Sequence, residues 1–394
     1  MPEGYIKMDF DLGEAYVKEG RLTAISKVDA VIFDCDGVLI DVRESYDKAI
    51  ARATAWIFEA LTGQRVPEDL LTSEVIFLFR RSGGFNNDCD IVYGLLMFLL
   101  SEMPPTLLNR LFEVIRTLKV EGNAAEKINA VKERINVGEA PIETINLIAK
   151  IEAFTFMLNE TGIASVDRAI LSLKNVPREA YDAIKSFLYG SKRVGEGVIA
   201  TVFEELFYGP ELFRRVHNIK PELFQSPGTI ENSRIIVRFE ALNRLTSLIG
   251  GAKFGIASGS PSAPAKQVLG SLLDLFDAGA LVFLDNILEG EKEYSERGFL
   301  KVSLGKPNPY PLLKSAWSLE PFRAAVFVGD SIEDALAVER ANRLDPRFIS
   351  AGVYAYTGAS ERAMREFLKF GCDIISPSVN EIPSIIEAAR RFPG

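Results

Sequence analysis

One short apolar run near the start of this chain, DAVIFD at residues 29–34, is separated by about two hundred residues from the runs that resemble it. Its β-branched and aromatic residues predict a strand buried on both faces of a parallel sheet. The similar runs are KFGIA at 253–257, GALVFL at 279–284, AVFV at 325–328 and FISAGV at 348–353. Because a lone strand would leave backbone groups unpaired, we expect 29–34 to join these later strands in one sheet.

Helical patterns alternate with the later strands, at 262–271, 309–317, 331–342 and 359–369. This alternation predicts an α/β fold with a doubly wound, Rossmann-like parallel sheet.

The intervening stretch is rich instead in amphipathic segments, at 45–62, 91–101, 143–159 and 232–248. We therefore expect a core of residues 1–41 and 250–394, with a large all-α cap at 42–249 inserted after the first strand. A helical domain separate from the sheet is the alternative, and it would leave 29–34 without partners.

The overall charge narrows the range of partners. A net charge of −9 and a pI near 5.1 predict no binding to nucleic acid or to an anionic membrane surface. The three scattered cysteines suit neither a disulfide framework nor a zinc cluster, which fits the cytoplasm. No apolar run is long enough for a transmembrane helix. With His217 the single histidine, we expect chemistry based on carboxylates.

The segment DCDGVLID carries the first candidate site. Asp34 and Asp36 follow the first predicted strand, and ligands of open α/β sheets bind at the carboxyl ends of strands. Two acids this close repel each other, so the pair favours a bound cation. A plain polar turn is the competing interpretation. A calcium loop fits poorly, because Gly37 comes too early in the segment.

Two further segments offer partners for an anion. In ASGSP, Ser258 and Gly259 would place a hydroxyl and backbone N–H groups near a helix N-terminus, although Ser260 or Ser262 could simply cap that helix. In GKPNP, Lys306 could neutralise both a carboxylate and a phosphoryl oxygen, although most lysines are solvated surface residues.

GDSIED supplies the fourth segment. Asp330 ends a predicted strand, and Asp334 lies one helical turn further on the same side. Both acids could instead complement the helix dipole. Four such segments in this order, each at a strand end or helix start, together favour an active site.

These segments resemble the motifs of the haloacid dehalogenase superfamily, which carries DxDGxLxD, a Ser or Thr after a second strand, a lysine and GDxxxD. The resemblance covers the predicted α/β core. It implies that Asp34 is the nucleophile, Asp36 the general acid and base, Ser258 a phosphate ligand and Lys306 a charge clamp. It further implies Mg²⁺ as cofactor, bound by Asp34, the Asp36 carbonyl and Asp330, with Asp334 acting through water or by orienting the site.

The expected function is a Mg²⁺-dependent phosphatase that hydrolyses a small phosphorylated substrate through an aspartyl-phosphate. A sugar phosphomutase is the nearest alternative, because the same residues can return the phosphoryl group when a cap excludes water. A dehalogenase would need neither Asp36 nor magnesium. A binding protein that has lost turnover is the alternative from another class.

The predicted cap is much larger than caps of the phosphatase-like subfamily that it resembles. Within it, FRRSGGFNND at 79–88 combines cations, glycines and amides, and a similar GGFNND segment occurs in some phosphatase-like members. Arg81, Asn86 and Asn87 are therefore candidate substrate contacts. The competing interpretation is a helix-breaking loop with asparagine caps.

Overall fold

The structure is a computed structural model that describes residues 3–85, 87–118, 122–135, 146–173, 176–299 and 302–392. The chain forms two compact units. The sheet unit comprises Met1–Val42 and Ser233–Gly394, and the helical unit comprises Arg43–Asn232. The helical unit therefore interrupts the sequence of the sheet unit.

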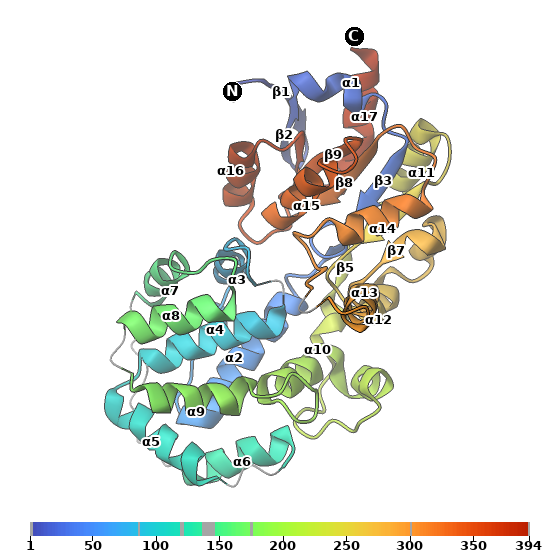
Figure 1. Cartoon of the computed structure of the whole chain (residues 1–394). Coiled ribbons are helices and arrows are strands. Elements are labelled where there is room, and N and C mark those ends of the chain that lie inside the picture. The colour runs from blue at the N-terminus through green and yellow to red at the C-terminus, as the bar shows by residue number, and fades with distance from the viewer. Residues whose placement is uncertain are drawn as a thin grey trace. The chain divides into compact units, whose positions relative to one another are not determined.

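An eight-stranded sheet forms the centre of the sheet unit, in the order β1-β2-β10-β9-β8-β3-β6-β7 (Figure 1). The strands from β10 to β7 are mutually parallel, whereas β1 and β2 pair antiparallel at one edge. The strands of this sheet are β1 (Tyr5–Phe10), β2 (Gly13–Lys18), β3 (Ala30–Phe33), β6 (Phe254–Ala257), β7 (Leu281–Val282), β8 (Ala325–Gly329), β9 (Phe348–Val353) and β10 (Ile374–Ser376).

The central strands are buried along their whole length, as expected for strands covered on both faces. Phe33 makes edge-to-face contacts with Phe254 and Phe276 in this core, and these two rings pack against each other at a tilt. The predicted α/β fold with a mostly parallel sheet is confirmed. Its first parallel strand is, however, the third strand of the chain, because the N-terminal hairpin β1–β2 precedes it.

Helices connect the parallel strands and cover the sheet. Because such crossovers are right-handed, connections that run in opposite directions along the sheet place their helices on opposite faces. Accordingly two helices, α14 (Tyr310–Ser318) and α15 (Ile332–Asn342), contact each other and the central strands. A second pair, α11 (Phe239–Ile249) and α17 (Ile382–Arg391), is also in mutual contact (Figure 1). The helices are α1 (Leu22–Ile25), α11 (Phe239–Ile249), α12 (Ser262–Leu269), α13 (Leu284–Glu296), α14 (Tyr310–Ser318), α15 (Ile332–Asn342), α16 (Ser360–Phe370) and α17 (Ile382–Arg391).

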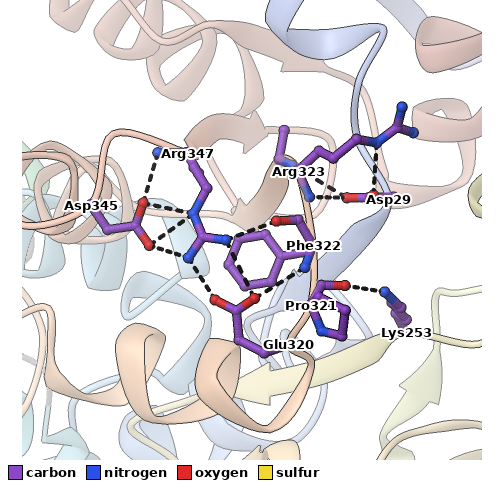
Figure 2. A network of polar contacts seen from close by, with 9 residues as sticks. Asp29, Lys253, Glu320, Pro321, Phe322, Arg323, Asp345 and Arg347 are labelled. Atoms are coloured by element: carbon purple, nitrogen blue, oxygen red, sulfur yellow. Dashed lines mark hydrogen bonds and ion pairs between the residues drawn. The ribbon is translucent and has the colours of Figure 1, made fainter.

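A polar network ties together the segments that lead into the parallel strands (Figure 2). Arg347, just before β9, pairs with Glu320 at 2.6 Å and with Asp345 at 2.7 Å, and its guanidinium lies 4.1 Å from the centre of the Phe322 ring. Arg323 pairs at 3.0 Å with Asp29, which precedes β3. The network thus lies at the amino ends of the strands, opposite the edge where the candidate site forms.

A two-stranded ribbon lies where the chain leaves and re-enters the sheet unit. β4 (Ile40–Asp41) pairs antiparallel with β5 (Arg234–Ile235). Asn380 holds the returning segment, accepting a hydrogen bond from the Arg238 N–H (2.8 Å) and donating one to the Ile236 carbonyl (2.9 Å). The sequence analysis placed this border at residues 249 and 250. The ribbon and α11 instead place residues 233–249 with the sheet unit.

The helical unit consists of helices packed around a buried centre, in which α8, α4 and α2 lie side by side (Figure 1). The buried Glu205 carboxylate accepts hydrogen bonds from three consecutive backbone N–H groups, those of residues 222–224, and so fixes one turn. The helices are α2 (Tyr46–Thr62), α3 (Ser73–Arg80), α4 (Asp88–Ser101), α5 (Pro105–Thr117), α6 (Ala124–Arg134), α7 (Leu147–Thr155), α8 (Ile163–Leu173), α9 (Arg178–Tyr189) and α10 (Val198–His217).

Most predicted elements agree with the structure. The predicted helix at 45–62 corresponds to α2, and 91–101 lies within α4. Of the prediction at 143–159, residues 143–145 lie outside the described residues and the helix spans Leu147–Thr155. The helix predicted at 232–248 begins only at Phe239. Within the described ranges, no helix combines the length and the apolar character that crossing a bilayer requires.

Candidate active site

Three strand ends bring the predicted residues to one edge of the sheet. β3 lies between β6 and β8, and the register pairs Phe33 with both Ile256 and Val328. Asp34, Ser258 and Asp330 follow these strands directly, so they emerge side by side. The Asp34 N–H donates to the Val328 carbonyl at 2.8 Å, which extends the sheet by one residue. Parallel pairing therefore delivers the acids and the hydroxyl to the same place.

Lys306 lies between two buried carboxylates. Its ammonium nitrogen is 2.7 Å from Asp34 Oδ2 and 2.6 Å from Asp334 Oδ1, and the three side chains are at most 10% exposed. The Asp34 Oδ1 accepts a hydrogen bond from the Cys35 N–H at 2.7 Å, and the Ser258 side chain also hydrogen-bonds Asp34. The structure therefore places Lys306, Ser258 and the Cys35 N–H in direct contact with the Asp34 carboxylate. Asp334 contacts the other side of the Lys306 ammonium.

The electrostatics of this group follow from its burial. Burial raises the pKa of the Asp34 carboxyl, and the neighbouring Asp334 adds to the rise, while the Lys306 ammonium opposes it. Burial alone would lower the pKa of Lys306, but the carboxylates of Asp334 and Asp34 outweigh it and raise that pKa. Lys306 is consequently a permanent cation at the site.

Asp334 is oriented by the first turn of α15. Its Oδ2 accepts hydrogen bonds from the Ser331 N–H (3.0 Å) and hydroxyl (2.6 Å), and Ser331 caps the helix in return. A Cβ added at Gly329 would lie 2.3 Å from the Asp334 Cβ, so a side chain there would displace this turn. Both oxygens of Asp334 therefore have protein partners, the Lys306 ammonium at Oδ1 and Ser331 at Oδ2.

Asp36 has a partner that the sequence analysis assigned to another role. The Ser260 hydroxyl donates a hydrogen bond to Asp36 Oδ2. Ser260 was considered only as a possible helix cap, but the N-cap position of α12 belongs to Pro261, and the Ser262 N–H donates to Asp285 at 2.9 Å. Gly259 is exposed, and a Cβ added there would meet none of the described residues within 4 Å.

Three carboxylates of this site could bind a cation together. Asp34, Asp330 and Asp334 each offer an oxygen atom, and these atoms lie within 4.8 Å of one another. Gly37 has a positive φ of 71°, and a Cβ added to it would lie 2.0 Å from Asp330 Oδ2, so the Asp330 carboxylate packs directly on the turn after Asp34. Carboxylate oxygens in such a cluster fit Mg²⁺. The Asp36 side chain is not in this cluster.

The predicted recognition residues belong to the helical unit. The Arg81 guanidinium lies 4.4 Å from the centre of the ring of Phe156, which is 70% exposed. Asn87 caps α4 by accepting a hydrogen bond from the Cys89 N–H at 2.9 Å, as in the competing interpretation of this segment. Asn86 lies outside the described residues.

The sequence analysis assigned no role in the site to two residues that contribute to it, Ser260 and Ser331. The spacing of Ser331 and Asp334 is the S-x-x-D signature of a capping box and could have identified that pair. The contact between Ser260 and Asp36 joins segments 224 residues apart, and no local signal predicts it.

The chain is similar to known proteins at the level of family and fold. The sequence matches the haloacid dehalogenase-like hydrolase family over residues 28–342, a range that contains every site residue of the sheet unit named above. No curated protein matches it. Among solved structures, target ZR25 of the Northeast Structural Genomics Consortium has a TM-score of 0.56 at 17% identity, covering 91% of this chain and 98% of that one. The phosphatase Tt82 from Thermococcus thioreducens has a TM-score of 0.43 at 21% identity, covering 82% and 92% respectively.

Proposed function

The chain belongs to the haloacid dehalogenase-like hydrolase family, and we propose that within it the protein is a Mg²⁺-dependent phosphatase of small phosphate monoesters. The observation that carries the proposal is the buried contact of 2.7 Å between the Asp34 carboxylate and the Lys306 ammonium. A carboxylate can attack an anionic phosphoryl group only where nearby positive charge offsets their repulsion.

The first step proposed is transfer of the phosphoryl group to Asp34. A carboxylate oxygen of Asp34 forms a bond to phosphorus as the ester P–O bond breaks. The carboxyl group of Asp36 gives its proton to the departing oxygen, which leaves as an alcohol. The products of this step are an aspartyl-phosphate and the Asp36 carboxylate.

The second step releases phosphate. Water attacks phosphorus while the Asp36 carboxylate accepts a proton from it, and the bond between phosphorus and the Asp34 oxygen breaks. Asp34 is thereby restored as a carboxylate and Asp36 as a carboxyl group. The site needs no imidazole for either step, in agreement with the single histidine of the sequence.

The remaining groups supply binding and charge. Lys306 neutralises Asp34 and the phosphoryl oxygens, while Ser258 and the Gly259 backbone bind the phosphoryl group. Asp34, Asp330 and the Asp36 carbonyl would hold Mg²⁺, with Asp334 orienting Lys306. When bound, the ion supplies positive charge that stabilises the phosphoryl oxygens in the transition state.

The proposal gives the two units different roles. The sheet unit is the catalytic core, and the helical unit is a cap that selects the substrate. Arg81 stays a candidate contact for an anionic substrate group, as the sequence predicts. Asn86 stays a candidate by sequence alone, and the capping hydrogen bond of Asn87 favours a structural role for that side chain.

The test is release of inorganic phosphate from p-nitrophenyl phosphate and a panel of sugar phosphates, with Mg²⁺ and with EDTA. We expect Mg²⁺-dependent release that Asp34→Asn abolishes while circular dichroism stays unchanged. Asp274→Asn, which changes an exposed acid of the same unit, is the matched control and should keep full activity. Release that persists in Asp34→Asn would disprove the nucleophile, and no release from any ester would disprove the phosphatase.

A further inference from the structure

Two pairs of side chains face each other across neighbouring segments of the site. Asp34 and Asp36 are two residues apart after β3, and Ser258 and Ser260 are two residues apart after β6. Because β3 and β6 are parallel neighbours, each hydroxyl meets one acid: Ser258 hydrogen-bonds Asp34, and Ser260 donates to Asp36. Of these four side chains, Ser260 alone has no part in the chemistry proposed so far.

The backbone of Ser260 is held on both sides. Its N–H donates to the Ser258 hydroxyl oxygen at 3.3 Å, and its carbonyl accepts a hydrogen bond from the Leu284 N–H at 3.0 Å. Leu284 is the first residue of α13, so this hydrogen bond ties the Ser260 backbone to a helix. The backbone of Ser260 is therefore fixed, and its hydroxyl, which donates to Asp36 Oδ2, can hold the Asp36 carboxyl in one orientation.

We infer that Ser260 is a positioning residue that holds Asp36 for proton transfer to the leaving-group oxygen. This inference rests on the proposed phosphatase activity. The rotation of an aspartate carboxyl is otherwise broad, since its terminal torsion has no sharp minima. A hydrogen bond from an anchored hydroxyl removes that freedom before the substrate binds, and catalysis by a positioned acid depends on such alignment.

The inference makes a prediction that depends on the leaving group. An alkyl phosphate expels an alkoxide, which needs a proton as it leaves, whereas p-nitrophenolate leaves readily without one. General acid catalysis contributes about 10²- to 10⁴-fold, and loss of positioning should forfeit part of it. We expect Ser260→Ala to lower kcat/KM about 10-fold or more for an alkyl phosphate and less than about 2-fold for p-nitrophenyl phosphate.

The quantity to measure is kcat/KM, because it reports only the steps up to departure of the leaving group. Wild type, Ser260→Ala and Ser260→Thr are compared on glycerol 3-phosphate and p-nitrophenyl phosphate with saturating Mg²⁺. Ser262→Ala, two residues further on at the start of α12, is the matched control and should match wild type on both esters. Ser260→Thr keeps the hydroxyl and should restore the ratio of the two kcat/KM values toward that of wild type.

The outcomes separate the inference from the function beneath it. A selective loss with the alkyl ester, restored by threonine, supports the positioning role. Equal losses on both esters, no loss, or a threonine variant as impaired as the alanine variant would overturn it while leaving the phosphatase intact. A wild-type enzyme that releases phosphate from neither ester, nor from any sugar phosphate of the panel, would refute the proposed function itself.

Discussion

Replacing Lys306 by methionine removes one charge from the centre of the site and nearly preserves side-chain volume. In the folded protein its ammonium separates two buried carboxylates, at 2.7 Å from Asp34 and 2.6 Å from Asp334. Without it, oxygens of these two groups remain within 4.8 Å of each other in a site that contains a third acid, Asp330. The change therefore tests what this cation does for both stability and catalysis.

The expected magnitudes follow from the geometry. Two carboxylates within 4.8 Å repel each other by at least about 3 kcal/mol at an effective dielectric constant of about 20. Removing one partner of a buried ion pair costs about 3–5 kcal/mol, so the free energy of unfolding in EDTA should fall by an amount of this order. Loss of a transition-state charge contact costs about 2.7–4 kcal/mol, which predicts a kcat lower by about 10²- to 10³-fold.

Magnesium should respond in the opposite direction. The ammonium repels a second cation bound to Asp34, so Lys306→Met should bind Mg²⁺ more tightly even as kcat falls. Chemical denaturation with and without Mg²⁺, calorimetric titration and steady-state kinetics measure the three effects. Lys292→Met, at a lysine that is 78% exposed, is the matched control. An unchanged kcat with a higher KM, or weaker Mg²⁺ binding, would refute this account of Lys306.

Two further predictions concern a backbone turn and a partly buried acid, Asp88, whose side chain is 22% exposed. Gly37→Ala forces a Cβ to within 2.0 Å of Asp330 Oδ2 at a φ of 71°, and should weaken Mg²⁺ binding about 10-fold or more in a calorimetric titration; unchanged binding would remove Asp330 from the metal site. Burial raises the pKa of Asp88 from 3.8 to about 6, so the folded state holds this proton more tightly and the free energy of unfolding should fall as pH rises from about 4 to about 6. Asp88→Asn should remove up to about 3 kcal/mol of that fall. Unfolding is measured by the fluorescence of Trp56 in a Trp317→Phe background, and an unchanged pH profile would refute the pKa shift of Asp88.

The central sheet could be predicted because its strands carry their own signal. Four-residue runs such as 30–33 and 254–257 are uniformly apolar, and burial on both faces requires that composition. The motif residues could be predicted for the same reason, because acids and hydroxyls directly after such runs must emerge at one edge of the sheet.

The N-terminal hairpin was missed for the opposite reason. β1 is an edge strand with alternating burial, and its charged residues Lys7 and Asp9 face the solvent side of the pattern. Charge on an edge strand protects it from pairing with other chains. The same charges make its sequence look like that of a polar loop, so no strand was predicted there. The strand predicted at 279–284 shortens to Leu281–Val282, because Asp277 caps a 3₁₀ turn through the Gly279 N–H.

Contacts between distant segments account for what the sequence could not provide. Nothing local distinguishes Lys306 from a solvated lysine, and only the fold places it 2.7 Å from Asp34. The pairing of Ser260 with Asp36 and the return of the chain through β5 likewise depend on segments that are remote in sequence.

The most direct test of the central claim is to trap the phosphoryl group on Asp34. Wild-type protein is mixed with Mg²⁺ and p-nitrophenyl phosphate, quenched in acid within the first turnover, and digested for mass spectrometry. The account predicts a phosphoryl adduct on the peptide that contains Asp34, which disappears with EDTA. A phosphoryl adduct on another residue would contradict the account. So would rapid turnover without any trapped adduct, if Asp34→Asn turned over just as fast.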